Sequence, residues 1–112
     1  MKMVGLSIDP RVRLSIELAL AGTSAGQPLL GKQEEAGRAL GMTGAEMDVA
    51  RRGSSFDFKI SVAISLALDA CQESRQRALY AGLSVEACAE IERIAQAIRA
   101  NPINLDIWRD AP

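Results

Sequence analysis

Helix-start signals followed by apolar residues at helical spacing constrain the fold of this chain more than any other feature. Polar residues suited to a helix N-cap stand at Asp9, Thr43, Asp57 and Ser84, and Asp9 precedes a proline, which suits the first helical position. Behind Asp9, Asp57 and Ser84, apolar residues recur three and four positions apart, as on one face of a helix. The sequence has no run of alternating β-branched residues bounded by turns. We therefore expect an all-α fold.

The same signals set the expected boundaries of five to six helices. The segments are a helix from Pro10 that ends before Gly22, one from Pro28 to Leu40, a short one between Thr43 and Gly53, a long one over 58–80, one from Ser84 to Ala100, and a possible short turn over 103–108. Two- to five-residue connections favour antiparallel helical hairpins. A chain of 112 residues has room for one core, so residues 1–112 are expected to form a single domain.

Composition excludes several classes of partner. The chain is 48% hydrophobic and 24% charged, with a net charge of −1, which is typical of soluble globular proteins. A near-zero charge gives no basic surface for nucleic acid. No segment approaches the roughly 18 apolar residues of a membrane span, and we expect no signal sequence, because Met1–Leu6 has no apolar run long enough for one. We expect a cytoplasmic protein that binds neither nucleic acid nor membrane.

The absence of histidine restricts the chemistry. With no histidine in the chain, Ser-His and Cys-His catalysis and His-ligated zinc are excluded. Carboxylates are the acid–base groups left at ordinary pH, and we interpret them as solvated helix caps and faces. No pair of carboxylates stands out as catalytic, and neither a cofactor nor a metal is expected.

The two cysteines, Cys71 and Cys88, both fall in apolar stripes, of the expected helices 58–80 and 84–100. Buried cysteine behaves as a small hydrophobe, so core packing is the first interpretation. The alternative is a redox pair across the turn at Gly82, although the usual spacing of packed helices exceeds the reach of a disulfide.

Four phrases in a fixed order suggest a family. They are Leu-Gly-Met-Thr-Gly-Ala-Glu at 40–46, Ala-Arg-Arg-Gly-Ser-Ser-Phe-Asp at 50–57, Ala-Gly-Leu-Ser at 81–84 and Asn-Pro-Ile-Asn at 101–104. In this order the sequence resembles the AhpD-like alkylhydroperoxidase and carboxymuconolactone decarboxylase family from Gly41 onward, and more loosely before it. The resemblance implies an AhpD-like helical domain that assembles as a homo-oligomer, typically a trimer or a hexamer.

The resemblance also implies where the active members carry their chemistry. They use a CxxC followed four residues later by His, with a Glu further upstream, and the two thiols cycle between dithiol and disulfide. This chain has Gly26, Leu29 and Gln33 at the Cys, Cys and His positions. The position of the upstream Glu falls near Leu14, and Glu17 is the nearest carboxylate. The family's peroxide-reducing mechanism cannot operate with these residues.

Three hypotheses follow from these substitutions. The first is a non-redox member of the family that serves as a binding or assembly protein, with a small-molecule pocket near Gln27, Lys32, Gln33 and Glu34; in the opposing interpretation these are surface groups over a closed site. The second is a decarboxylase or isomerase that uses carboxylates, for which Lys32 and Glu34 are the nearest charged pair. The third is a thiol enzyme that uses Cys71 and Cys88.

Overall fold

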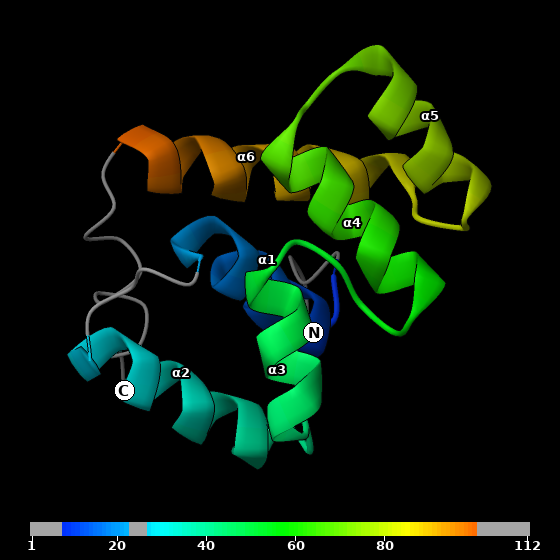
Figure 1. Ribbon diagram of the computed structural model, residues 1–112. Coiled ribbons are helices and arrows are strands. Elements are labelled where there is room, and N and C mark those ends of the chain that lie inside the picture. The colour runs from blue at the N-terminus through cyan, green and yellow to red at the C-terminus, as the bar shows by residue number, and fades with distance from the viewer. Residues whose placement is uncertain (1–7, 23–26, 101–112) are drawn as a thin grey trace, which may run out of the picture.

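The computed structural model describes residues 8–22 and 27–100, and these residues form six helices and no strand (Figure 1). The helices are α1 (Pro10–Ala21), α2 (Gln27–Ala39), α3 (Gly44–Arg51), α4 (Phe58–Leu68), α5 (Gln72–Tyr80) and α6 (Val85–Ala100). The expected all-α fold of five to six helices is confirmed. The turn expected over 103–108 lies outside the described residues.

Helix α1 occupies the centre of the molecule. It packs against α3 and α4, and also against α2 and α6, so that in Figure 1 it lies between α6 on one side and α2 and α3 on the other. Its residues from Leu14 to Ala19 are all buried. The sequence predicted a single apolar stripe for this helix. The structure buries it on every side, because neighbours surround it, and this buries Ser15 and Glu17 as well.

The expected helix caps are confirmed. The side-chain oxygens of Asp9, Asp57 and Ser84 accept hydrogen bonds from the backbone N–H groups of Arg11, Ile60 and Ala87 at 2.8, 3.1 and 3.0 Å. Thr43 and Glu46 form the reciprocal capping box at the start of α3. Local side-chain chemistry therefore fixes these four helix starts.

The long helix expected over 58–80 is wrong: the chain breaks between Leu68 and Gln72. The Arg99 guanidinium, from α6, donates hydrogen bonds to the carbonyl oxygens of Ala67 and Leu68 at 2.5 and 2.8 Å, so it satisfies carbonyls at the end of α4 that a continuous helix would satisfy internally. On the other side of the break, the Ser74 hydroxyl donates to the Asp69 carbonyl at 2.7 Å and accepts from the Cys71 N–H at 3.1 Å.

The break explains why the two cysteines differ in burial. Cys88 is fully buried in α6, as predicted, whereas Cys71 is exposed at the start of α5, so its predicted place in the core is wrong. The stripe that placed Cys71 in the core assumed a helix continuous through residue 71. Both cysteines are free thiols. The predicted apolar face of the last helix holds from Cys88 to Ile98, but Val85, in its first turn, is 59% exposed.

None of the described helices is both long enough and apolar enough to span a bilayer.

Candidate functional site

The residues predicted to surround the family's motif position lie along α2, with different environments. Gly26 lies outside the described residues, and Gln27 is the first residue of α2. Leu29 is half-buried and packs against the hydrophobic core, and Lys32 is half-buried. Gln33 is fully buried, while the Glu34 side chain is 43% exposed. The side chains in this stretch therefore run from the core to the surface.

Gln33 is the most unusual of these residues. Its side chain is wholly buried, and among the described residues neither the amide oxygen Oε1 nor the amide nitrogen Nε2 has a hydrogen-bond partner. A buried polar group without a partner costs about 1–3 kcal/mol. Among the described elements, α2 packs against α1 and α3. The amide of Gln33 thus offers a free donor and a free acceptor inside the molecule.

Helix α2 approaches α3 closely one turn after Gln33. A Cβ at Gly37 would lie 2.3 Å from the Met47 sulfur, so only glycine allows this contact without displacing the methionine. Toward the end of α3, the Arg51 Nη2 atom lies 3.8 Å from Glu34 Oε2. Glu34, one turn before Gly37 in α2, therefore lies near the C-terminal end of α3.

Arg51 is a candidate site residue that the sequence did not reveal. Its side chain is 10% exposed, and within residues 8–22 and 27–100 its Nε and Nη2 atoms have no hydrogen bond, since 3.8 Å to Glu34 is beyond hydrogen-bonding distance. Arg51 and Arg52 are adjacent cations at the C-terminal end of α3, where both suit the negative end of the helix dipole. No local signal distinguishes them, yet the Arg52 side chain is 69% exposed and pairs with Asp48 at 2.9 Å.

The charges around Glu34 do not balance. The Glu34 carboxylate lies 3.8 Å from Arg51 and also 3.8 Å from Arg38, whose side chain is 69% exposed. One carboxylate is thus shared between two guanidinium groups, and neither distance is that of a hydrogen bond. These three side chains together carry a net charge of +1.

Glu17, the carboxylate nearest the upstream position, has a different environment. Its side chain is 2% exposed and accepts a hydrogen bond from Arg13 Nε at 3.4 Å, one turn earlier in α1. A buried carboxylate that is paired with a cation is held in place by that partner. Glu17, the carboxylate nearest the upstream position, therefore forms a structural ion pair with Arg13.

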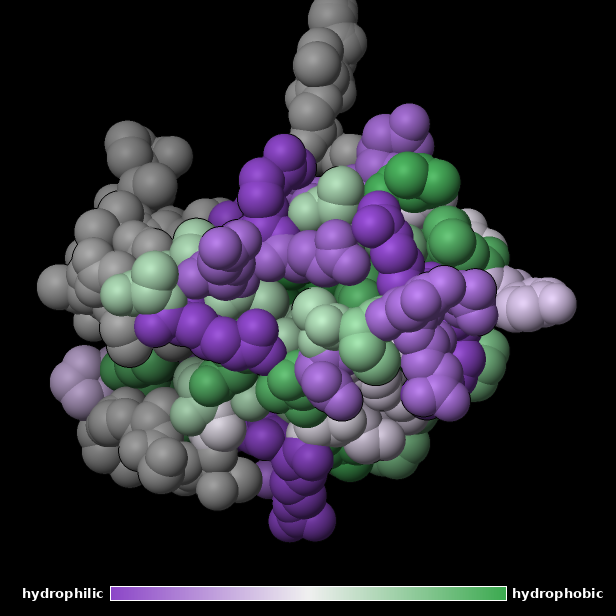
Figure 2. Space-filling model, turned by 90° about the horizontal axis from the view of Figure 1, so that it is seen from above, coloured by the Kyte–Doolittle hydropathy of each residue, from purple (hydrophilic) through white to green (hydrophobic). Residues whose placement is uncertain are grey.

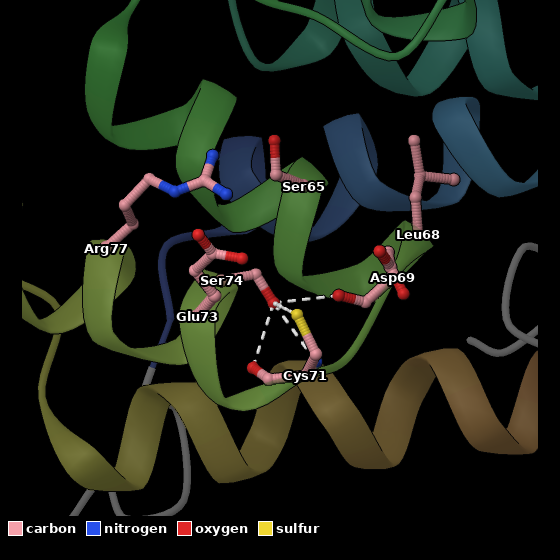
Figure 3. A pocket seen from close by; sticks show the side chains of 7 residues that line it. All are labelled: Ser65, Leu68, Asp69, Cys71, Glu73, Ser74 and Arg77. Atoms are coloured by element: carbon pink, nitrogen blue, oxygen red, sulfur yellow. Dashed lines mark hydrogen bonds between the residues drawn. The ribbon is translucent and has the colours of Figure 1, made fainter.

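A second candidate site is an open groove of about 290 Å³ at the break between α4 and α5 (Figure 3). It is lined by Ser65, Leu68, Asp69, Cys71, Glu73, Ser74 and Arg77. The Cys71 sulfur lies 3.5 Å from the Ser74 hydroxyl oxygen. Hydrogen bonding with the side chain and then the backbone of Ser74 lowers the pKa of the Cys71 thiol, whereas burial raises the pKa of Cys88. Cys71 is therefore the more exposed thiol and the one with the lower pKa.

In the described residues, no group of three or more potential metal-ligating side chains comes together. Comparison of the chain with models of known protein families, with curated proteins and with solved structures found no match. The family resemblance stays a prediction.

Proposed function

We propose that this chain is a non-redox member of the AhpD-like and carboxymuconolactone decarboxylase family that binds a small molecule between α2 and α3 and acts as a homo-oligomer. The observation that carries the proposal is the fully buried Gln33 amide, whose donor and acceptor both lack partners. Uncompensated polar groups of this kind are rare in native interiors, and a functional role is one of the established reasons for them.

The identity of the residue supports recognition rather than electron transfer. Gln33 stands where the resemblance expects a proton-carrying His. An amide donates and accepts hydrogen bonds but does not titrate at ordinary pH. A site built on Gln33 and Arg51 can therefore orient a polar ligand, and it provides neither a thiol nor a general base.

Exposed apolar side chains support the homo-oligomer. A Cβ at Gly82 would lie 3.5 Å from Lys59 Cε, so the α5–α6 turn lies against the start of α4. Three exposed apolar side chains lie close in sequence to Lys59 or to Gly82. They are Phe58, Tyr80 and Val85, which are 71%, 93% and 59% exposed. The face in Figure 2 shows hydrophobic patches interrupted by hydrophilic side chains. Exposed aromatic groups of this size are typical of interfaces.

Oligomeric state is tested by light scattering coupled to size-exclusion chromatography. A trimer or hexamer is expected, and Tyr80→Asp is expected to shift it toward monomer. If the unsubstituted protein elutes as a monomer at all concentrations, this part of the proposal is contradicted.

Binding is tested by melting the protein with a panel of small polar compounds. Bound ligand raises the melting temperature, and Gln33→Leu is expected to abolish the rise, because it removes the donor and the acceptor at similar volume. The matched control is Gln96→Leu, since Gln96 is exposed on α6. A panel in which no compound stabilises the original chain, or in which Gln33→Leu responds like the control, contradicts the proposal.

Two other activities have a specific observation in their favour. A carboxylate-based decarboxylase or isomerase is favoured by the Glu34 carboxylate, whose Oε2 atom lies 3.8 Å from Arg51 Nη2. Lys32, the other charged residue predicted for this site, is half-buried in the same helix as Glu34. A thiol activity of Cys71 and Cys88 is favoured by exposed Cys71 but opposed by the burial of Cys88. A peroxide-reduction assay on the Cys71→Ser variant decides the thiol case.

A further inference from the structure

We propose that the ligand of the α2–α3 site carries a carboxylate, which binds the Nε–Nη2 edge of Arg51 in place of Glu34. This inference rests on the binding function proposed above and assigns the chemical class of the ligand. Arg51, Glu34 and Arg38 form the charged part of the site, and Gln33 forms its neutral part.

The geometry of the free atoms selects the ligand. Nε and Nη2 lie on the same edge of a guanidinium group, and their two N–H bonds run parallel, which matches the two oxygens of a carboxylate. In Arg51 these are the two buried atoms without a hydrogen bond. An arginine whose bidentate edge is buried and unused is costly unless an acceptor reaches it.

The local charge favours an anion over a neutral acceptor. Glu34 is shared between Arg38 and Arg51, so one positive charge in the trio is uncompensated. The side chain of Arg51 is nine-tenths buried, where charges are screened less than at the surface. A carboxylate on Arg51 would leave Glu34 with Arg38 and bring the group of four charges to zero.

Glu34 provides the route to the buried edge. Its side chain is 43% exposed and lies 3.8 Å from Arg51 Nη2. Because it is as close to exposed Arg38 as to Arg51, it can move toward Arg38 without losing its cationic partner. Glu34 thus competes with the ligand for Arg51.

The simpler alternative is an internal pair, in which Glu34 closes onto Arg51 and no ligand is involved. The two cases predict different effects of one substitution on the affinity for the ligand. If Glu34 competes with a ligand, Glu34→Gln removes the competitor and tightens binding. If Glu34 is the intended partner of Arg51, the same change creates no affinity and leaves the arginine with a weaker acceptor.

The test measures the binding of sodium benzoate by calorimetry, with benzamide as the neutral analogue and inorganic phosphate as a second anion. Benzoate is expected to bind at least about tenfold more tightly than benzamide or phosphate, because a charge-assisted bidentate pair is the stronger and more specific interaction. Glu34→Gln is expected to tighten benzoate binding about threefold or more, and Arg51→Met to weaken it at least about tenfold.

Two further variants control the interpretation. Arg38→Met is expected to weaken benzoate binding, since Glu34 then has only Arg51 to pair with. Arg52→Met is the matched control, because Arg52 is the neighbouring arginine and its side chain is exposed, and it should leave benzoate binding unchanged. If Arg51→Met does not fold, the opposite effects of the substitutions at Glu34 and Arg38 decide the question on folded protein.

The carboxylate inference is overturned if benzoate does not bind at millimolar concentration, if benzamide or phosphate binds equally well, or if Glu34→Gln leaves the affinity unchanged or lowers it. The binding function itself fails separately. If neutral compounds of the panel stabilise the protein through Gln33 while benzoate does not, the ligand class is wrong and the binding function stands.

Discussion

Two groups of polar side chains, one at the α4–α5 break and one on α2 and α3, differ in how their hydrogen bonds are satisfied. Buried Ser74 and exposed Arg99 place their polar atoms on backbone groups within 3.1 Å. Gln33, which is fully buried, and Arg51, whose side chain is 10% exposed, leave four polar atoms without a hydrogen bond in the part of the chain that the structure describes. The first group explains a structural feature, the break in the helix. The second costs stability and explains nothing in the fold, which is why we assign it to ligand binding.

Ser74→Ala is expected to give the largest loss of stability, about 2 kcal/mol in the free energy of unfolding. Ser74 is 4% exposed, and its removal leaves the Cys71 N–H and the Asp69 carbonyl without their partner. Urea unfolding followed by circular dichroism measures the change. Ser54→Ala, at an exposed serine, is the control and should stay within about 0.5 kcal/mol. Equal effects at the two positions would remove the contrast between the two regions.

Arg99→Met is expected to cost about 1.5 kcal/mol, because two carbonyls at the end of α4 lose a charged donor. The same unfolding experiment measures it. Arg93→Met is the matched control on α6, since Arg93 pairs with Glu90 at the surface and such pairs contribute little. If Arg99→Met is as mild as the control, α4 ends at Leu68 for another reason.

Gln33→Leu is expected to leave the free energy of unfolding unchanged or to raise it by about 1 kcal/mol. The two substitutions above are expected to lower it. Gln33→Leu replaces an unsatisfied buried amide by an apolar group of similar volume. Unfolding without added ligand gives the sign. A loss of more than about 1 kcal/mol would show that Gln33 has a structural partner, and the two regions would then be alike.

Glu46, in the first turn of α3, is a polar group with partners. A substitution there tests whether satisfied polar groups also stabilise the side of the molecule that holds Gln33. The hydrogen bond from the Thr43 backbone N–H lowers the pKa of Glu46 from its usual 4.5, and Arg11 pairs with it at 3.2 Å. A lowered pKa stabilises the fold above the unfolded value, and this contribution is lost as the pH falls through the folded pKa. Glu46→Gln should therefore be slightly less stable at pH 7, and the difference should close below pH 4.5.

The smallest expected effect is chemical rather than energetic. Cys71 should react with a thiol-specific disulfide reagent in the native protein while Cys88 reacts only after unfolding, because burial protects Cys88. Ser74→Ala should slow the native reaction near pH 7, since hydrogen bonds from Ser74 lower the pKa of Cys71. Two reactive thiols in the native state would contradict the packing of α6.

Helix starts were predictable because their causes are local. The capping box of Thr43 and Glu46 and the cap at Asp57 each satisfy backbone donors within three residues. The position of Cys71 was not predictable, because the break beside it depends on Arg99, which lies 31 and 32 residues away from its two acceptors. Gln33 was predicted as a site residue, but its burial was not, since the residues around it are charged.

The sequence by itself determined that this protein is helical and where most of its helices begin, because spacing and capping act within a few residues. Only the tertiary structure decided which polar groups are buried with partners and which without. Arg51 and Arg52 are identical in type and adjacent in sequence, yet one is buried with an unused edge and the other exposed in an ion pair. Burial and pairing depend on neighbours from other helices, and no local pattern records those neighbours.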